Sequence, residues 1–272
     1  MTAKTQLGYD LTLVKAHAGA HLNVSAKEKR DRVNIFYVLE QHATTKATAD
    51  HPFLVYEGKS WTFKEAYQIV LQYGTWLKTT YAIAPKEVVA MDFMNSDKFV
   101  FLCLGLWSIG AVPGFINYNL TGDPLLHSIR ASSARIAIVD PEVKARFTTE
   151  VTDTLASPSA RDGKGPIEVL YLDAATEQQI LSTKGEREPD HARTAMRLDL
   201  ALLIFTSGTT GLPKPGFVSW QKILLLSSFV PTWLGLKKTD RYYTVGWPCG
   251  FLLGRSANPK SVCPYTIPLP RF

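Results

Sequence analysis

Cysteine is scarce in this sequence, and its placement argues against two classes of protein. The three cysteines, Cys103, Cys249 and Cys263, form neither a C-x-x-C pair nor a metal-binding spacing with histidine. We therefore expect neither a disulfide-rich secreted fold nor a zinc module, and we assign no residue as a metal ligand. Three isolated cysteines fit a reducing compartment. Cys103 lies in an apolar run and is expected in the core.

Long uninterrupted apolar segments are also missing. Residues 1–30 lack the continuous apolar stretch of a secretory signal. Residues 99–118 carry no charge over a length that could span a bilayer, but Gly110, Pro113 and Gly114 interrupt them. These breaks favour a buried helix, turn and strand, with a membrane span as the alternative.

A concentrated stripe of one charge is absent as well. The net charge of +6 is spread along the chain, so we expect no nucleic-acid partner. Basic clusters occur at residues 27–32 and at Lys237 and Lys238. We interpret both as solvated faces, and attraction to an anionic membrane surface is the alternative.

The most informative feature is an apolar strand, residues 200–205, followed directly by the sequence Thr-Ser-Gly-Thr-Thr-Gly-Leu-Pro-Lys. Glycines can turn successive backbone N–H groups toward an anion, hydroxyls can donate to phosphate oxygens, and lysine adds a point charge. The spacing is not that of a Walker loop. The alternative is a flexible surface loop. The predicted phosphate-binding residues are Thr206, Ser207, Gly208, Thr209, Thr210, Gly211 and Lys214.

Alternating strand and helix patterns predict the fold class, an α/β domain with a mainly parallel sheet flanked by helices. Thr62 and Glu65 form a capping box, so a helix should begin there after a hairpin. Asp123 and Asp140, each followed by proline, should cap two further helices. The charged residues 184–197 are expected to be a flexible connection. Strands are expected at residues 88–93, 111–116, 136–139, 169–172, 200–205, 215–219 and 241–245, and helices at residues 31–43, 97–109, 174–181 and 219–230.

The turn at residues 206–214 resembles the phosphate-binding signature of the adenylate-forming (AMP-binding) superfamily. Residues 116–127 and the sequence after Lys214 look most like its fatty acid transport protein branch, the very long-chain acyl-CoA synthetases. The resemblance implies an incomplete N-terminal domain of an adenylate-forming enzyme, in which His127 is of structural use. Pro215 departs from the family pattern and removes a backbone donor beside the lysine.

The same resemblance implies a ligase that uses ATP, Mg²⁺ and coenzyme A to activate long-chain or very long-chain fatty acids, linked to fatty acid uptake. It implies an intracellular protein with peripheral membrane contact, at the endoplasmic reticulum, peroxisome or lipid droplet. It gives no oligomeric state. A Ser/His/Asp hydrolase has little support, because the sequence has no G-x-S-x-G elbow.

The resemblance fades near residue 245. We divide the chain into a lead-in at residues 1–30, a partial AMP-binding domain at residues 31–245 and a divergent, irregular tail at residues 246–272. The family's adenine-binding segment, magnesium-holding acidic residue, ribose-binding aspartate and catalytic lysine have no counterpart here, so no catalytic residue is assigned. The alternative function is therefore a catalytically inactive, truncated fragment with at most weak nucleotide binding.

Overall fold

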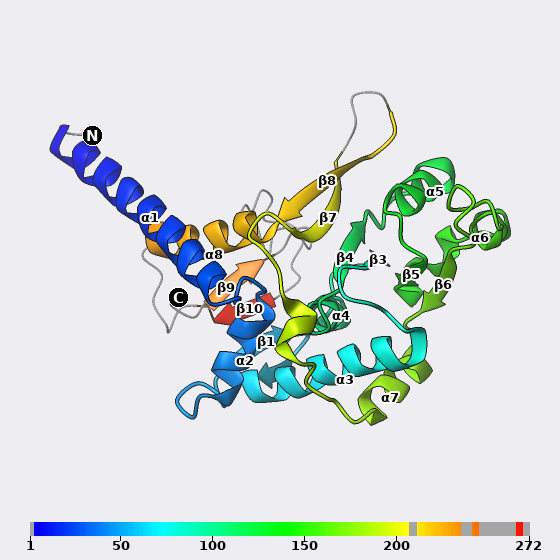
Figure 1. The fold of residues 1–272 in the computed structure, drawn as a ribbon, viewed down its shortest axis with the longest axis horizontal. Coiled ribbons are helices and arrows are strands. Elements are labelled where there is room, and N and C mark those ends of the chain that lie inside the picture. The colour runs from blue at the N-terminus through cyan, green and yellow to red at the C-terminus, as the bar shows by residue number, and fades with distance from the viewer. Residues whose placement is uncertain (1–2, 207–210, 235–240, 245–264, 269–272) are drawn as a thin grey trace. The chain divides into compact units, whose positions relative to one another are not determined.

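The chain divides into two compact units in the computed structural model (Figure 1), which describes residues 3–206, 211–234, 241–244 and 265–268. One unit comprises Met1–Tyr67, Ala195–Asp199 and Ser219–Phe272, and the other comprises Gln68–Thr194 and Leu200–Val218. The second unit contains the strand and the turn predicted to bind phosphate. We call it the sheet unit.

A six-stranded sheet forms the centre of the sheet unit, in the order β6-β5-β3-β4-β7-β8. Neighbouring strands from β6 to β7 all pair in parallel, which confirms the predicted α/β class with a mainly parallel sheet. The strands are β3 (Val88–Asp92), β4 (Val112–Ile116), β5 (Ile136–Val139), β6 (Glu168–Tyr171), β7 (Leu200–Thr206) and β8 (Lys214–Ser219).

The strand order reverses at β3, because β4 lies on one side of it and β5 on the other. In open α/β sheets such a reversal leaves a crevice at the carboxyl ends of the strands, where ligands bind. Asp92 ends β3 and Thr206 ends β7, so both lie at this carboxyl edge. The predicted turn therefore begins at the carboxyl edge of the sheet, at the end of a strand that β4 separates from β3.

Side chains cap most of the helices between these strands. Ser96, Thr148 and Asp173 accept hydrogen bonds from the first turns of α4 (Asp97–Ser108), α6 (Thr149–Ala156) and α7 (Ala174–Ser182). Asp140 caps the 3₁₀ helix η1 (Pro141–Arg146), as predicted from the Asp-Pro pair. The prediction for Asp123 was wrong: α5 (Gly122–Ala131) begins two residues earlier than predicted, with Thr121 at the N-cap, so Asp123 lies inside the first turn.

The uncharged stretch at residues 99–118 is core, as predicted. Its helix α4 is buried from Phe99 to Ser108, and this includes Cys103. The Trp107 indole N–H donates to the carbonyl of Ala201 in β7 at 2.8 Å. Within the described ranges, no helix combines the length and apolar character needed to cross a membrane.

The segment at residues 184–194, expected to be flexible, is anchored to the sheet unit. The buried Arg193, in the 3₁₀ helix η2 (Asp190–Arg193), donates to the carbonyl of Ser108 at 2.6 Å. The carbonyl of Ala192 also approaches Gly110 so closely that a Cβ there would collide with it. Charge-rich composition did not reveal this anchoring because its partners are distant in sequence.

The other unit contains a four-stranded antiparallel sheet in the order β2-β1-β10-β9. Its strands are β1 (Pro52–Tyr56), β2 (Lys59–Thr62), β9 (Arg241–Thr244) and β10 (Tyr265–Pro268). Its helices are α1 (Ala3–Lys29), α2 (Phe36–Thr44) and α8 (Trp220–Leu234), and α3 (Phe63–Tyr81) begins in it. The capping box is confirmed: Thr62 N–H donates to Glu65 at 2.8 Å, and Glu65 N–H donates to the Thr62 hydroxyl at 3.2 Å.

Helix α8 is longer than the sequence predicts. A proline normally ends a helix because it lacks the N–H and clashes with the preceding turn. Pro231 nevertheless lies inside α8, which continues to Leu234. The helix packs along α1, and Asn23 donates to the Ser228 hydroxyl at 2.8 Å. This tertiary support offsets the cost of the proline.

Candidate functional site

The two strands that flank the predicted phosphate-binding turn form an antiparallel ribbon (Figure 1). The Thr206 hydroxyl donates to the Lys214 carbonyl at 3.4 Å, and Gly216 lies against Ile204. The residue numbers of both pairs have the same sum, as antiparallel pairing requires. This confirms that a second strand, and not a helix, follows the lysine. Ser207, Gly208, Thr209 and Thr210 lie outside the described residues.

The three predicted residues that the structure does describe, Thr206, Gly211 and Lys214, are all exposed. Gly211 has a φ of 94°, which side-chain-bearing residues rarely adopt, and a Cβ built on it would meet nothing within 4 Å. Lys214 has no ion-pair partner among the described side chains. The end of the turn is therefore open, and its lysine is available to an anion.

A residue outside the predicted set touches this turn. His127 in α5 places its ring Nε2 3.0 Å from the carbonyl oxygen of Pro213, the residue before Lys214. Because a carbonyl oxygen only accepts, Nε2 must carry the hydrogen. The two residues are 86 positions apart in sequence, so no local signal could reveal the contact.

Two aspartates lie at the same carboxyl edge, after neighbouring strands. Asp140 accepts from the backbone N–H groups of Glu142 at 3.0 Å and Met94 at 3.3 Å. Asp92 is 1% exposed, and neither of its carboxylate oxygens has a hydrogen-bond partner within the described part of the chain. Burial raises the pKa of Asp92 to about 7, Arg146 opposes this rise, and Asp140 adds to it. Nothing in the sequence distinguished Asp92 from an ordinary strand residue.

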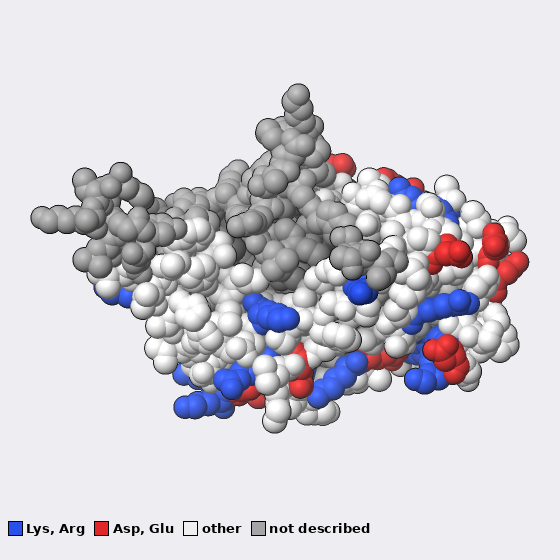
Figure 2. Space-filling model, turned by 90° about the horizontal axis from the view of Figure 1, so that it is seen from above, with Lys and Arg blue, Asp and Glu red and all other residues white. Residues whose placement is uncertain are grey.

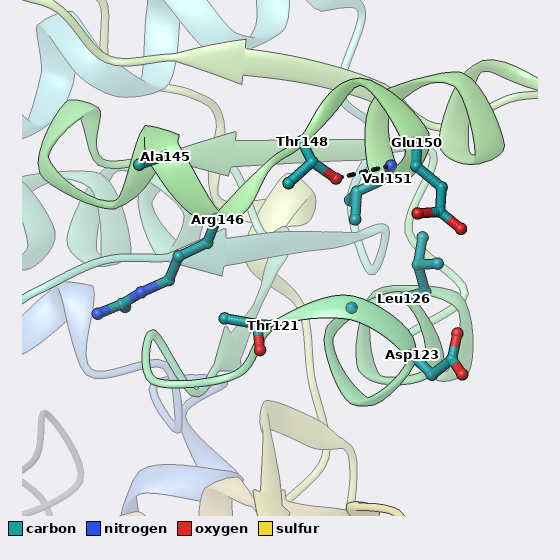
Figure 3. Close-up of a pocket in the computed structure, with 9 residues that line it drawn as sticks. Thr121, Asp123, Leu126, Ala145, Arg146, Thr148, Glu150 and Val151 are labelled. Atoms are coloured by element: carbon teal, nitrogen blue, oxygen red, sulfur yellow. Dashed lines mark hydrogen bonds between the residues drawn. The ribbon is translucent and has the colours of Figure 1, made fainter.

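A cavity of about 480 Å³ lies between the start of α5 and the segment that joins η1 to α6. Figure 3 shows Leu126 and Val151 beside the carboxylates of Asp123 and Glu150, while Arg146 extends away from both acids. The mixed charges and the first turn of α5, whose N-cap residue Thr121 makes no side-chain capping hydrogen bond, could hold a polar ligand. None of the described residues of the predicted turn, Thr206 and residues 211–214, lines this cavity.

A second cavity, of about 570 Å³, lies in the other unit beside the basic cluster at residues 27–32. It is lined by Lys27, Arg30 and Arg32 together with Glu40. Burial and the charge of Arg30 lower the pKa of Lys27.

On the face shown in Figure 2, basic and acidic side chains are interspersed and do not form a stripe of one sign.

The described residues of the turn fit a polyphosphate better than a metal ion. Glycine with positive φ, a hydroxyl and a lysine without an ion-pair partner suit phosphate oxygens. Among the residues whose positions are described, no group of three or more His, Cys, Asp or Glu side chains is arranged to hold a metal ion. No described residue is assigned to Mg²⁺ or to coenzyme A.

Comparison with known proteins gives a consistent picture. Residues 39–258 match the sequence profile of the AMP-binding enzyme family. Two similar relatives are both named very long-chain fatty acid transport protein. The one from Cochliobolus heterostrophus is 32% identical over 225 residues, 81% of this chain and 33% of the relative. The one from Saccharomyces cerevisiae is 34% identical over 173 residues, 60% of this chain and 24% of the relative.

A solved structure shows the same fold. The Mycobacterium tuberculosis fatty acyl CoA synthetase superimposes with a TM-score of 0.59 at 19% identity, over 78% of this chain and 38% of that one. The chain thus spans a quarter to a third of the length of the two curated relatives. The likeness to this solved structure is one of fold.

Proposed function

This chain belongs to the AMP-binding enzyme family, and we propose that its turn at residues 206–214 holds the β- and γ-phosphates of ATP. The observation that carries the proposal is the position of Thr206, Gly211 and Lys214, which are exposed at the carboxyl edge of a parallel sheet within the matched region. The proposed phosphate-binding set is Thr206, Ser207, Gly208, Thr209, Thr210, Gly211 and Lys214, of which the middle four have no described position.

The proposed activity is that of an acid–thiol ligase. A fatty acid carboxylate would attack the α-phosphate of ATP and release pyrophosphate, and the thiol of coenzyme A would then displace AMP from the acyl group. The first step moves negative charge onto the leaving phosphates, so it needs positioned donors more than a nucleophile. The role of this chain's residues would be to orient those phosphates. Mg²⁺, bound with ATP, would neutralise part of the charge.

The substrate class is proposed from the relatives. Two of them carry very long-chain fatty acid transport in their names, which supports a long-chain or very long-chain acid and a link to fatty acid uptake. Peripheral contact with an intracellular membrane belongs to the same proposal. The division into residues 31–245 as the adenylation domain and residues 246–272 as a divergent tail also stays a proposal.

A second candidate function is nucleotide binding without turnover. The fact that favours it is the length matched: the chain spans 33% and 24% of the two curated relatives. Residues that lie elsewhere in those relatives would then be needed for catalysis. The two candidates differ in whether these 272 residues suffice for the reaction.

One assay separates the candidates. The purified chain is given ATP, Mg²⁺, coenzyme A and oleate or a longer acid, and acyl-CoA is measured beside ATP binding. Turnover that is lost in Lys214→Ala and kept in Lys59→Ala, which changes an exposed lysine of the other unit, supports the ligase. ATP binding without acyl-CoA supports the second candidate. Absence of both would overturn the proposed phosphate site.

A further inference from the structure

His127 touches the turn at one atom, and this contact can orient the lysine next to it. The ring Nε2 donates to the Pro213 carbonyl at 3.0 Å. In a trans peptide the carbonyl and the following N–H point in opposite directions, and no described peptide bond is cis. A bond that fixes the Pro213 carbonyl therefore also fixes the direction of the Lys214 N–H.

The residues on both sides of Lys214 strengthen this effect. Pro213 and Pro215 each have a fixed φ, and a residue before proline is restricted to extended conformations. Lys214 is such a residue, and its own carbonyl accepts from Thr206 at 3.4 Å. Few backbone torsions remain free around Lys214, and the orientation of the Pro213–Lys214 peptide plane is set by the contact with α5.

His127 is itself held in place by a buried helix. Leu125, Leu126, Ser128 and Ile129 of α5 are buried, and Leu125 and Ile129 belong to the same apolar cluster as Leu203 and Phe205 of β7. The Ser128 hydroxyl donates to the Pro124 carbonyl at 2.8 Å. His127 therefore lies on a helix, α5, that packs into the same apolar core as β7, the strand before the turn.

We infer that His127 is a positioning residue for the phosphate-binding turn, whose ring N–H orients the Pro213–Lys214 peptide so that Lys214 faces the polyphosphate of ATP. The inference rests on the proposed function for the choice of ligand. The contact itself does not depend on that choice. His127 would not touch substrate, and it would act through the turn.

Three variants test this role. His127→Phe keeps a planar ring and removes the donor. His127→Gln keeps a side-chain N–H that can reach the same carbonyl. Ser128→Ala is the matched control, because it removes a partly buried hydrogen bond within α5 without touching the turn. Each full chain is compared with the wild type in thermal stability, in hydrogen exchange at the amides of Lys214, Gly216 and Phe217, and in ATP affinity.

We expect His127→Phe to speed exchange at these amides and to weaken ATP binding about 3- to 10-fold, the size of one neutral hydrogen bond. His127→Gln should restore both properties. Ser128→Ala should lower the melting temperature and leave both unchanged. The inference is overturned if His127→Phe matches the wild type in exchange, if exchange changes while ATP affinity does not, or if His127→Gln behaves like His127→Phe.

Failure of the proposed function gives a different result. If the wild type and all variants bind no ATP, the phosphate site is wrong. The exchange data still decide the positioning role: faster exchange in His127→Phe alone supports it, and equal exchange in all chains refutes it.

Discussion

The backbone N–H of Asp140 donates to the carbonyl of Asp92 at 2.9 Å, and this bond brings two carboxylates to the ends of the neighbouring strands β5 and β3. Their surroundings differ sharply. The Asp140 carboxylate accepts two backbone N–H bonds at the start of η1. The Asp92 carboxylate is buried, and both of its oxygens lack a partner among the described residues. Hydrogen bonds from described residues replace lost hydration for the Asp140 carboxylate and not for the Asp92 carboxylate.

Asp92 should make the stability of the protein depend on pH. Burial raises its folded-state pKa to about 7 from an ordinary value of 3.8. The folded state therefore holds a proton that the unfolded state loses, so the free energy of unfolding should fall as pH rises from about 4 to 7. The contribution is at most about 4.5 kcal/mol, at roughly 1.4 kcal/mol per pKa unit.

Replacing Asp92 with a neutral side chain tests this directly. Asp92→Asn should flatten the fall in stability between about pH 4 and pH 7, measured by urea denaturation at each pH. Asp153→Asn, which changes an exposed acid on α6, should keep the wild-type slope. Equal slopes in all three chains would mean that Asp92 does not take up the proton.

Lys214 should contribute most of its effect to ATP affinity and little to stability. It is exposed and lacks an ion pair among the described side chains, so truncation leaves no buried group unsatisfied. Lys214→Ala should remove one charge-assisted contact, about 1.5 to 3 kcal/mol, or roughly 10- to 150-fold in Kd by calorimetry. Lys59→Ala should change neither quantity. An unchanged Kd in Lys214→Ala would remove the lysine from the site.

Local features of this fold could be predicted from the sequence. The capping box needs only Thr62 and Glu65, three residues apart, and the strand before the turn needs only an apolar run. The end of helix α8 could not be predicted in this way, because the helix continues past Pro231 while it packs on the distant helix α1. A single sequence shows the proline that would normally end a helix, but it does not show the packing of α8 on α1.

The candidate site likewise has a part that the local sequence predicts and a part that depends on tertiary contacts. Composition alone predicted the residues of the turn, since glycine, hydroxyls and lysine are grouped in one short stretch. The partner of that turn, His127, lies 86 residues from Pro213, and its histidine could equally have been core or surface. In the sequence, Asp92 is indistinguishable from an ordinary strand residue. The structure shows that it ends β3 and that its side chain is buried. Both depend on the strand order, which no local pattern specifies.

Gly211 should be needed because the turn requires a positive φ, and not because a larger side chain would collide with its neighbours. Its φ of 94° is strained for alanine, although a Cβ would meet no atom within 4 Å. Gly211→Ala should therefore cost roughly 1 to 2 kcal/mol or shift the turn, and ATP affinity should fall. Gly163→Ala is the matched control, since Gly163 also has a positive φ of 82° and open surroundings but lies in a loop before β6. If both variants bind ATP like the wild type, the turn does not need this conformation.

Arg193 should be the strongest stabilising cation in the segment that joins α7 to β7. Its guanidinium is buried, and it donates to the carbonyls of Ser108 at 2.6 Å and Glu188 at 2.9 Å. Arg193→Met keeps most of the volume but leaves those carbonyls without this donor, so we expect a loss of about 3 kcal/mol or more in the free energy of unfolding. Arg187→Met should lose less than about 1 kcal/mol, because Arg187 is more than a third exposed in its 2.6 Å ion pair with Asp190. Denaturant unfolding of both variants measures the difference, and equal losses would show that the buried guanidinium does not anchor this segment.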